Sequence, residues 1–159
     1  MSQKNVFAVM LALTSLVASK AQAAGSSASA TADAKQVVES GLSLTKTADL
    51  DFGTAVLGDG DKTVASAADN AENANFSVQG EPGKAFTVTL PSSPVTMING
   101  AGADADHQIV VDSFSSNLSS GNLDGSGAAG LIVGAHRAAI GNSQASGAYV
   151  GSFTVTVAY

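Results

Sequence analysis

The chain has 159 residues, with 13 acidic against 7 basic side chains and a formal net charge of −6 at pH 7. This balance argues against nucleic acid as a partner, because phosphate contacts need clustered Lys and Arg, and Arg137 is the single arginine. The chain has no cysteine, so it is not a small scaffold held together by disulfides, and packing and hydrogen bonds must stabilise it.

The first 23 residues are typical of a secretory signal peptide. Lys4 supplies the positive start, an apolar stretch follows, and Ala21-Gln22-Ala23 predicts cleavage between Ala23 and Ala24. The apolar stretch is shorter than the roughly 20 residues that span a bilayer, so we expect no transmembrane segment in the mature chain. Cleavage also removes two lysines, Lys4 and Lys20, which takes the formal charge from −6 to −8.

Residues 24–35 lack large side chains, as is typical of a flexible N-terminal extension. The alanines of this segment alternate with polar residues at the spacing of a β-strand. A second interpretation is therefore that the segment lies along the edge of a sheet. The alternating alanines are Ala28, Ala30, Ala32 and Ala34.

Residues 36–159 predict one all-β domain, a sandwich of about seven to nine short strands. Short apolar pieces recur along this region and are separated by Gly, Pro, Asn and Asp, which favour turns. Residues 115–128 are predicted to form a long surface loop. The predicted strands cover residues 36–44, 50–57 (with a break at Gly53), 76–78, 85–90, 95–98, 108–114, 131–140 and 148–159.

A hairpin is predicted around Pro82 and Gly83, which fit the two central positions of a type II turn. Proline presets a negative φ, and glycine supplies the positive φ that the next position needs. Phe76 and Val78 would face the core from the first arm, and residues 85–90 would form the second arm.

The final residues alternate without a break between apolar and small or polar side chains. Because a strand turns successive side chains to opposite faces, this pattern predicts a half-buried strand that the fold needs. The side chains expected to face inward are Phe153, Val155, Val157 and Tyr159. The core candidates of the whole domain are Phe52, Phe76, Phe86, Phe153 and Val155.

No catalytic constellation stands out, and we expect the protein not to be an enzyme. Nucleophilic catalysis needs a base beside a nucleophile. The chain has two histidines, His107 and His136, but it has no cysteine and no sequence motif that identifies one serine as a nucleophile. Three carboxylate pairs two residues apart resemble parts of a calcium site, but they lack the ligand string of an EF-hand. Solvated acidic turns are the favoured interpretation, and no metal or cofactor is expected. These pairs are Asp49/Asp51, Asp59/Asp61 and Asp104/Asp106.

Three pieces of sequence together resemble a known group: LSLTKTADLDFG at 42–53, FTVTL at 86–90 and GAYVGSFTVTVAY at 147–159. With the alternating N-terminal segment, they resemble a family of functionally uncharacterised secreted domains from Gram-negative bacteria. That family is in turn similar to spore coat protein U and to the subunits of archaic chaperone–usher pili. The resemblance covers nearly all of residues 28–159.

The resemblance implies an incomplete immunoglobulin-like sandwich whose open groove receives a strand from a neighbouring subunit, as in β-strand addition. The implied groove is bordered by residues 37–44 and 149–159, and the implied donor strand is residues 24–36. The chain departs from the pilin pattern because it lacks a cysteine pair and offers only alanines as small apolar donor residues. The implied donor residues are Ala28, Ala30, Ala32, Ala34, Val37 and Val38. The implied acceptor residues are Tyr149, Phe153, Val155, Val157 and Tyr159.

Two functions from different classes follow. The first is a non-enzymatic exported structural subunit of the periplasm, cell surface or extracellular space. It would associate with copies of itself, helped by a periplasmic chaperone and an usher. The second is a self-contained secreted monomer that binds glycan or calcium through the loops at 58–62, 101–107 and 115–128.

Overall fold

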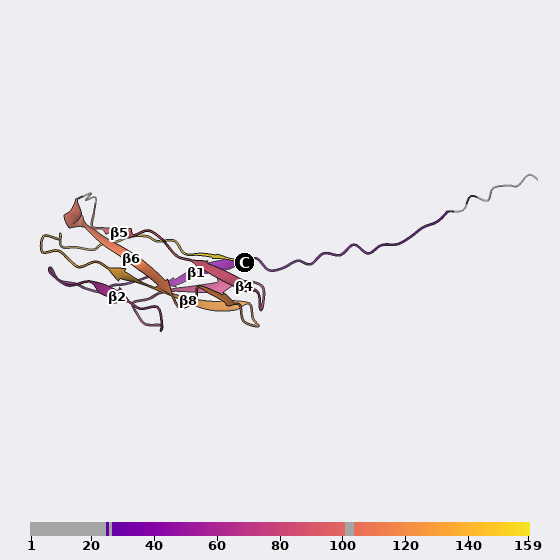
Figure 1. Ribbon diagram of the computed structural model, residues 1–159, viewed down its shortest axis with the longest axis horizontal. Helices are drawn as coiled ribbons and strands as arrows, with labels where there is room; N and C mark the ends of the chain where they lie inside the picture. Colours follow the sequence, from indigo (N-terminus) through magenta and orange to yellow (C-terminus); the bar gives the residue numbers. More distant parts are fainter. Residues whose placement is uncertain (1–24, 26, 101–103) are drawn as a thin grey trace, which may run out of the picture. The chain divides into compact units, whose positions relative to one another are not determined.

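Figure 1 shows the computed structural model of the chain, which describes residues 25, 27–100 and 104–159. The predicted signal peptide, residues 1–23, and the predicted cleavage site between Ala23 and Ala24 lie outside these residues. The chain divides into two units, Met1–Gln36 and Val37–Tyr159. In the first unit, residue 25 and residues 27–36 contain no helix and no strand.

The second unit is an all-β sandwich, as the sequence predicts. Its larger sheet has the strand order β1-β3-β8-β6-β5, all antiparallel, and β2 pairs with the far part of β8. The strands of this sheet are β1 (Ser43–Ala48), β2 (Lys62–Val64), β3 (Ala74–Gln79), β5 (Val95–Ile98), β6 (Gln108–Ser116) and β8 (Ala128–Arg137). A short 3₁₀ turn, η1 (Ala105–His107), precedes β6.

The smaller sheet has three strands in the order β7-β4-β9. These are β4 (Ala85–Thr89), β7 (Ser120–Asn122) and β9 (Thr156–Ala158). Val88 of β4 lies opposite Val157 of β9, so the last strand of the chain is paired on that side alone. Further back, a single bridge between Ile98 and Val150 ties the final segment to β5.

The core lies between the two sheets, and the central strand β8 supplies much of it. Alternate side chains of β8 point inward because a strand repeats every two residues: Leu131, Val133 and Ala135 are all nearly fully buried. Phe86 from β4 and Val78 from β3 complete the main cluster. A second cluster packs nearer the other end of β8; its buried members are Phe52, Val64, Val111 and Ala135.

The turn at Pro82 and Gly83 is confirmed, but the hairpin built on it is wrong. Gly83 has φ of 72° and Lys84 donates to the Glu81 carbonyl at 3.2 Å, as a type II turn requires. The strands on either side nevertheless belong to different sheets, since β3 pairs with β1 and β8 whereas β4 pairs with β7 and β9. The turn therefore carries the chain from one sheet to the other.

Other boundaries also differ from the prediction: the strand expected at residues 36–44 begins only at Ser43 and runs on to Ala48. Residues 115–128 are not one surface loop, because β6 continues to Ser116, β7 follows, and Leu123 is nearly fully buried. Residues 50–57 form no strand, although Phe52 from this segment is in the core as predicted. No helix in the described part of the chain has the length and apolar character that a membrane crossing needs.

Candidate functional site

One side of the sandwich carries two strand edges that do not pair with each other. β1 is one edge strand of the larger sheet, and β9 is one edge strand of the smaller sheet. The two strands lie close together in space, yet no ladder joins them among the residues that the structure describes. The backbone groups along both edges are therefore left to pair with something else.

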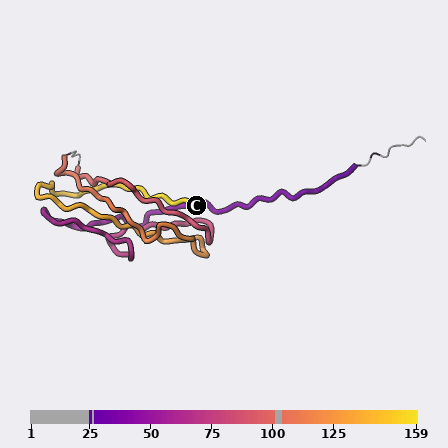
Figure 2. The backbone as a smooth tube through the Cα atoms, viewed as in Figure 1, coloured from indigo at the N-terminus to yellow at the C-terminus, as the bar shows by residue number. Residues whose placement is uncertain are grey.

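The final segment borders this open side over a long stretch. Figure 2 shows it, in yellow, running along the domain to the C-terminus. The predicted alternation is present: Phe153, Val155 and Val157 are half-buried, whereas Thr154 and Thr156 are exposed. The ring of Phe153 packs against that of Phe114, with centroids 5.0 Å apart. Only residues 156–158 of the predicted strand 148–159 join a ladder, so most of its length is held by side chains rather than by pairing.

Apolar side chains along this open side are only partly covered. They pack on the main core cluster, yet each keeps part of its surface accessible. Partly covered apolar side chains leave hydrophobic surface beside the two edges. Those on or next to the edges are Leu42 and Leu44 at β1 and Phe153, Val155 and Val157 of the final segment.

Tyr159 closes one end of the open side by binding the start of the domain. Its hydroxyl donates to the Ser40 carbonyl at 3.3 Å and accepts from the Glu81 N–H at 2.6 Å. Lys84 lies 4.8 Å from the centre of the ring. The side chain is 46% exposed, so this residue, which the sequence analysis placed toward the core, serves instead as a polar clamp.

Tyr149 holds the other end of the final segment. Its hydroxyl lies 2.6 Å from the Ala145 carbonyl and 2.9 Å from the Asp106 carbonyl, and it accepts from the Gln144 amide at 3.1 Å. Gln144 also donates to the Asp106 carbonyl at 2.7 Å. This network fixes the turn before the final segment against η1.

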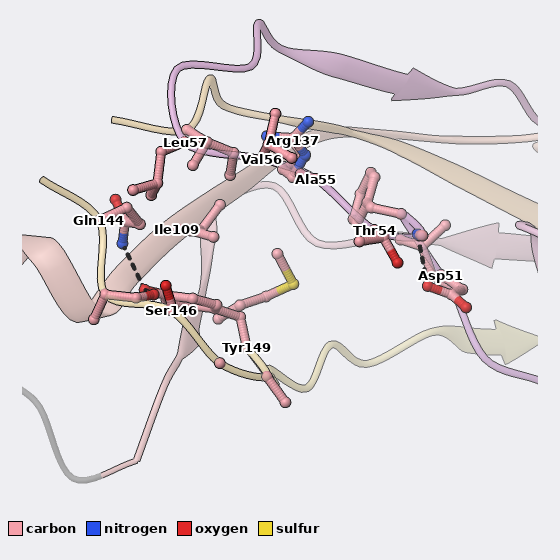
Figure 3. Close-up of a pocket in the computed structure, with 18 residues that line it drawn as sticks. Asp51, Thr54, Ala55, Val56, Leu57, Ile109, Arg137, Gln144, Ser146 and Tyr149 are labelled. Carbon is pink, nitrogen blue, oxygen red and sulfur yellow. Dashed lines mark hydrogen bonds between the residues drawn. The ribbon is translucent and has the colours of Figure 1, made fainter. Parts of the chain in front are cut away.

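Next to Tyr149, the open side widens into a cavity of about 840 Å³ (Figure 3). Residues 50–57, which follow β1, form one wall, and residues 144–149, which precede the final segment, form the other. Ile109 and Met97 from the larger sheet lie at the cavity, as does Ile140. The two walls of the cavity follow β1 and precede the final segment in the chain, and we call the cavity and the two unpaired edges together the groove, bounded by residues 42–57 and 144–159.

Arg137 also lines the cavity, and the sequence analysis did not single it out. It continues the inward-facing series of β8 and is 5% exposed. One terminal nitrogen donates to the Ala138 carbonyl at 2.8 Å and the other to the Gly60 carbonyl at 3.1 Å, while Nε has no partner. Among the described residues it has no carboxylate partner. Arg137 follows Leu131, Val133 and Ala135 at steps of two residues, so the alternation of a strand predicts that it faces the core with them.

The predicted donor residues Ala28, Ala30, Ala32 and Ala34 lie in the first unit, in a segment that has no strand of its own. Val37 and Val38 belong to the second unit and are 85% and 84% exposed. The following residues are fixed, because Glu39 pairs with Lys84 and the Ser40 N–H donates to Glu81 at 2.8 Å. The two valines are therefore presented to solvent beside an anchored turn.

The histidine with the most developed surroundings, His136, faces carboxylates and not a nucleophile. Nδ1 lies 2.8 Å from Asp112 and Nε2 lies 3.3 Å from Asp61. The hydrogen bond that His136 donates to Asp112, with a smaller contribution from Asp61, raises the pKa of His136 above 6.5, and the same bond lowers the pKa of Asp112 below 3.8. Both ring nitrogens are occupied, so neither is free to activate a serine.

The acidic pairs serve turns. Asp51 accepts from the Gly53 N–H at 2.7 Å, and Asp59 accepts from the Val56 N–H at 2.8 Å. Within the part of the chain that the structure describes, no group of three or more His, Cys, Asp or Glu side chains is placed to hold a metal ion. Asp51 and Asp59 are thus used locally, as expected of Asp residues that cap turns, whereas Asp61 contacts His136.

Comparison with known proteins gives one match. The family described as "Domain of unknown function (DUF4402)" matches residues 42–159. These residues include every strand of the sandwich and both borders of the groove. No curated protein and no solved structure matches the chain.

Proposed function

The chain belongs to the DUF4402 family, and we propose that it is an exported, non-enzymatic structural subunit that assembles by strand addition. In this function the groove accepts an extended segment of another copy, and residues 24–36 are the segment that each copy donates. The product is a fibre or coat of the cell surface or extracellular space of a Gram-negative bacterium. A periplasmic chaperone and an usher assist its assembly.

The observation that carries this proposal is the pair of unpaired edges, β1 and the final segment, with half-buried apolar side chains between them. An inserted strand would satisfy the free backbone donors and acceptors of the final segment. It would also cover Leu44, Phe153 and Val155, whose burial contributes about 25 cal/mol per Å². The alternation in residues 28–34 and the resemblance to pilins support the same function.

The experiment is sedimentation velocity of the mature chain over a range of concentrations. We expect the full chain to form oligomers as its concentration rises, and a chain without residues 24–36 to keep its β-sheet circular dichroism but remain monomeric. A matched control replaces residues 24–36 by a Gly-Ser segment of the same length, which keeps the reach and loses the alternation. A full chain that stays monomeric at its highest soluble concentration would refute the proposal.

A further inference from the structure

We propose that Gln36 of one copy enters the cavity of the next, where its side-chain carbonyl oxygen accepts a hydrogen bond from Arg137. This contact would set the register in which the segment lies in the groove. The inference rests on the proposed function and adds to it a direction and a specific polar contact.

The first step is the unmet requirement of Arg137. A guanidinium has five N–H donors, and the structure shows bonds from two of its nitrogens to carbonyl oxygens while Nε has none. A buried charge that lacks compensation costs several kcal/mol, so an acceptor brought into the cavity beside Arg137 is strongly favoured. Whatever fills this end of the groove should carry an oxygen.

The second step is which part of a donated segment reaches this end. A copy's segment leaves its own domain next to Ser40, at the Tyr159 end of the groove. Arg137 lies at the opposite end of the domain. Gln79 is two residues before Glu81, which binds Tyr159, and it pairs with Ala128, the first residue of β8. Arg137 is the last residue of β8. A ten-residue strand spans about 33 Å. Figure 1 likewise shows the C-terminus at one end of the domain.

Copies stacked head to tail therefore bring the start of one domain to the Arg137 end of the next. The residues nearest the donor's own domain, Gln36 among them, then lie at the cavity, and residues toward 24 continue along the groove toward Tyr159. Residues 24–36 reach about 40 Å when extended, which is enough to cover the groove. The donated strand would run antiparallel to the final segment of its acceptor.

The third step is which face of the segment points inward. Ala28, Ala30, Ala32 and Ala34 share one face, and the next residue on that face is Gln36. The other face carries Ser29, Thr31, Asp33 and Lys35, which suit solvent. Gln36 is thus the one long side chain of the inward face, and it carries the acceptor oxygen that Arg137 lacks. Alanine side chains are short, whereas a long side chain is needed to reach Arg137 in the cavity.

The test measures the association constant of the full mature chain by sedimentation velocity for a series of variants at Gln36. Gln36→Glu places a carboxylate opposite Arg137 and should tighten association by about tenfold, because charge-assisted hydrogen bonds are the stronger ones. Gln36→Leu keeps the size, removes the acceptor and should weaken association. The matched control is Thr31→Glu, which adds the same charge on the outward face and should not tighten association.

The partner side is tested with Arg137→Gln, which should abolish the difference between the parent and Gln36→Glu. Since this variant can lose stability, its folding is checked by thermal unfolding. The pH dependence offers a second measurement, because the advantage of Gln36→Glu should vanish below about pH 4 as the new carboxylate is protonated.

The outcomes separate the two proposals. A full chain that does not associate refutes both. Association that is insensitive to Gln36, or equal effects of Gln36→Glu and Thr31→Glu, overturns this inference and leaves strand addition standing. A stability change at Gln36 that does not depend on concentration would mean that the groove is filled by the chain's own segment, which also overturns it.

Discussion

Gly134 in the middle of β8 is a residue whose lack of a side chain the fold requires. A Cβ at this position would lie 2.0 Å from the Val64 carbonyl oxygen of the neighbouring strand β2. Backbone atoms cannot move aside without breaking the β2–β8 ladder, so Gly134→Ala should lower the free energy of unfolding by about 1–3 kcal/mol or more. Urea denaturation measures this change.

The control for that substitution lies in the same strand. A Cβ at Gly130 would have no atom within 4 Å, so Gly130→Ala should be neutral or slightly stabilising. Equal losses at the two positions would show that the close approach of β2 to Gly134 does not limit the side chain there.

His136 makes the stability of the fold depend on pH. Its pKa is raised above 6.5 by Asp112 and then Asp61, so its contribution is fully present below pH 6.5 and disappears as pH rises through the raised pKa. The lowered pKa of Asp112 acts in the opposite sense, because its contribution is lost as pH falls below 3.8. The charged pair therefore stabilises the fold most between these two limits.

The corresponding experiment follows the urea midpoint from pH 5.5 to 8.5. The parent should lose stability across this range, and His136→Gln, which cannot carry the charge, should show a flatter profile. Asp112→Asn should flatten it as well, since it removes the main cause of the raised pKa. Parallel profiles for all three proteins would contradict this assignment.

Among the elements, the final segment contributes a core side chain, Phe153, that is only partly buried. Phe153 is half-buried, whereas Phe86 in β4 is 1% exposed. Phe86→Ala should cost about 3–5 kcal/mol, and Phe153→Ala about 2 kcal/mol in the monomer, because part of that ring already faces water. Denaturation of both variants under conditions that keep the chain monomeric tests the difference, and equal costs would mean that the groove is closed.

The sequence predicted those parts of the fold that depend on neighbouring residues. Side-chain alternation identified the final segment, and Pro82-Gly83 identified a type II turn, because both features depend only on residues that are adjacent in sequence. The pairing of β3 and β4 was predicted wrongly, since a type II turn fits a hairpin and a crossing between sheets equally well. Which of the two occurs is decided by distant partners: β8 for β3, and β9 for β4.

The candidate site was predictable in outline and not in its chemistry. The resemblance implied groove borders at residues 37–44 and 149–159, and it did not include residues 50–57 and 144–148, which line the cavity. Arg137 was not, because only pairing in register turns a lone arginine after an apolar run into a buried cavity residue. Tyr159 was assigned to the wrong environment for a similar reason: its hydroxyl partners, Ser40 and Glu81, are remote in sequence.

For the whole molecule, the main feature is a sandwich of two sheets in which no ladder joins β1 to β9 among the described residues. The main cluster around Val78, Phe86 and Val133 is fully covered, so the domain holds a core of its own. The groove is where this core ends in half-covered side chains. The oligomerisation proposed above is a property of the whole molecule, because a strand of a second chain would cover these side chains.

The groove also has distinguishable ends, with Tyr159 clamped to Ser40 at one and the Arg137 cavity at the other. A series of copies joined through the groove would be polar: a vacant groove would remain at one tip, and an unused tail, residues 24–36, would remain at the opposite tip. A copy that lacks its tail could accept the unused tail at the opposite tip but would offer no tail to a further copy, so a small dose of such tailless protein would end elongation there and control filament length.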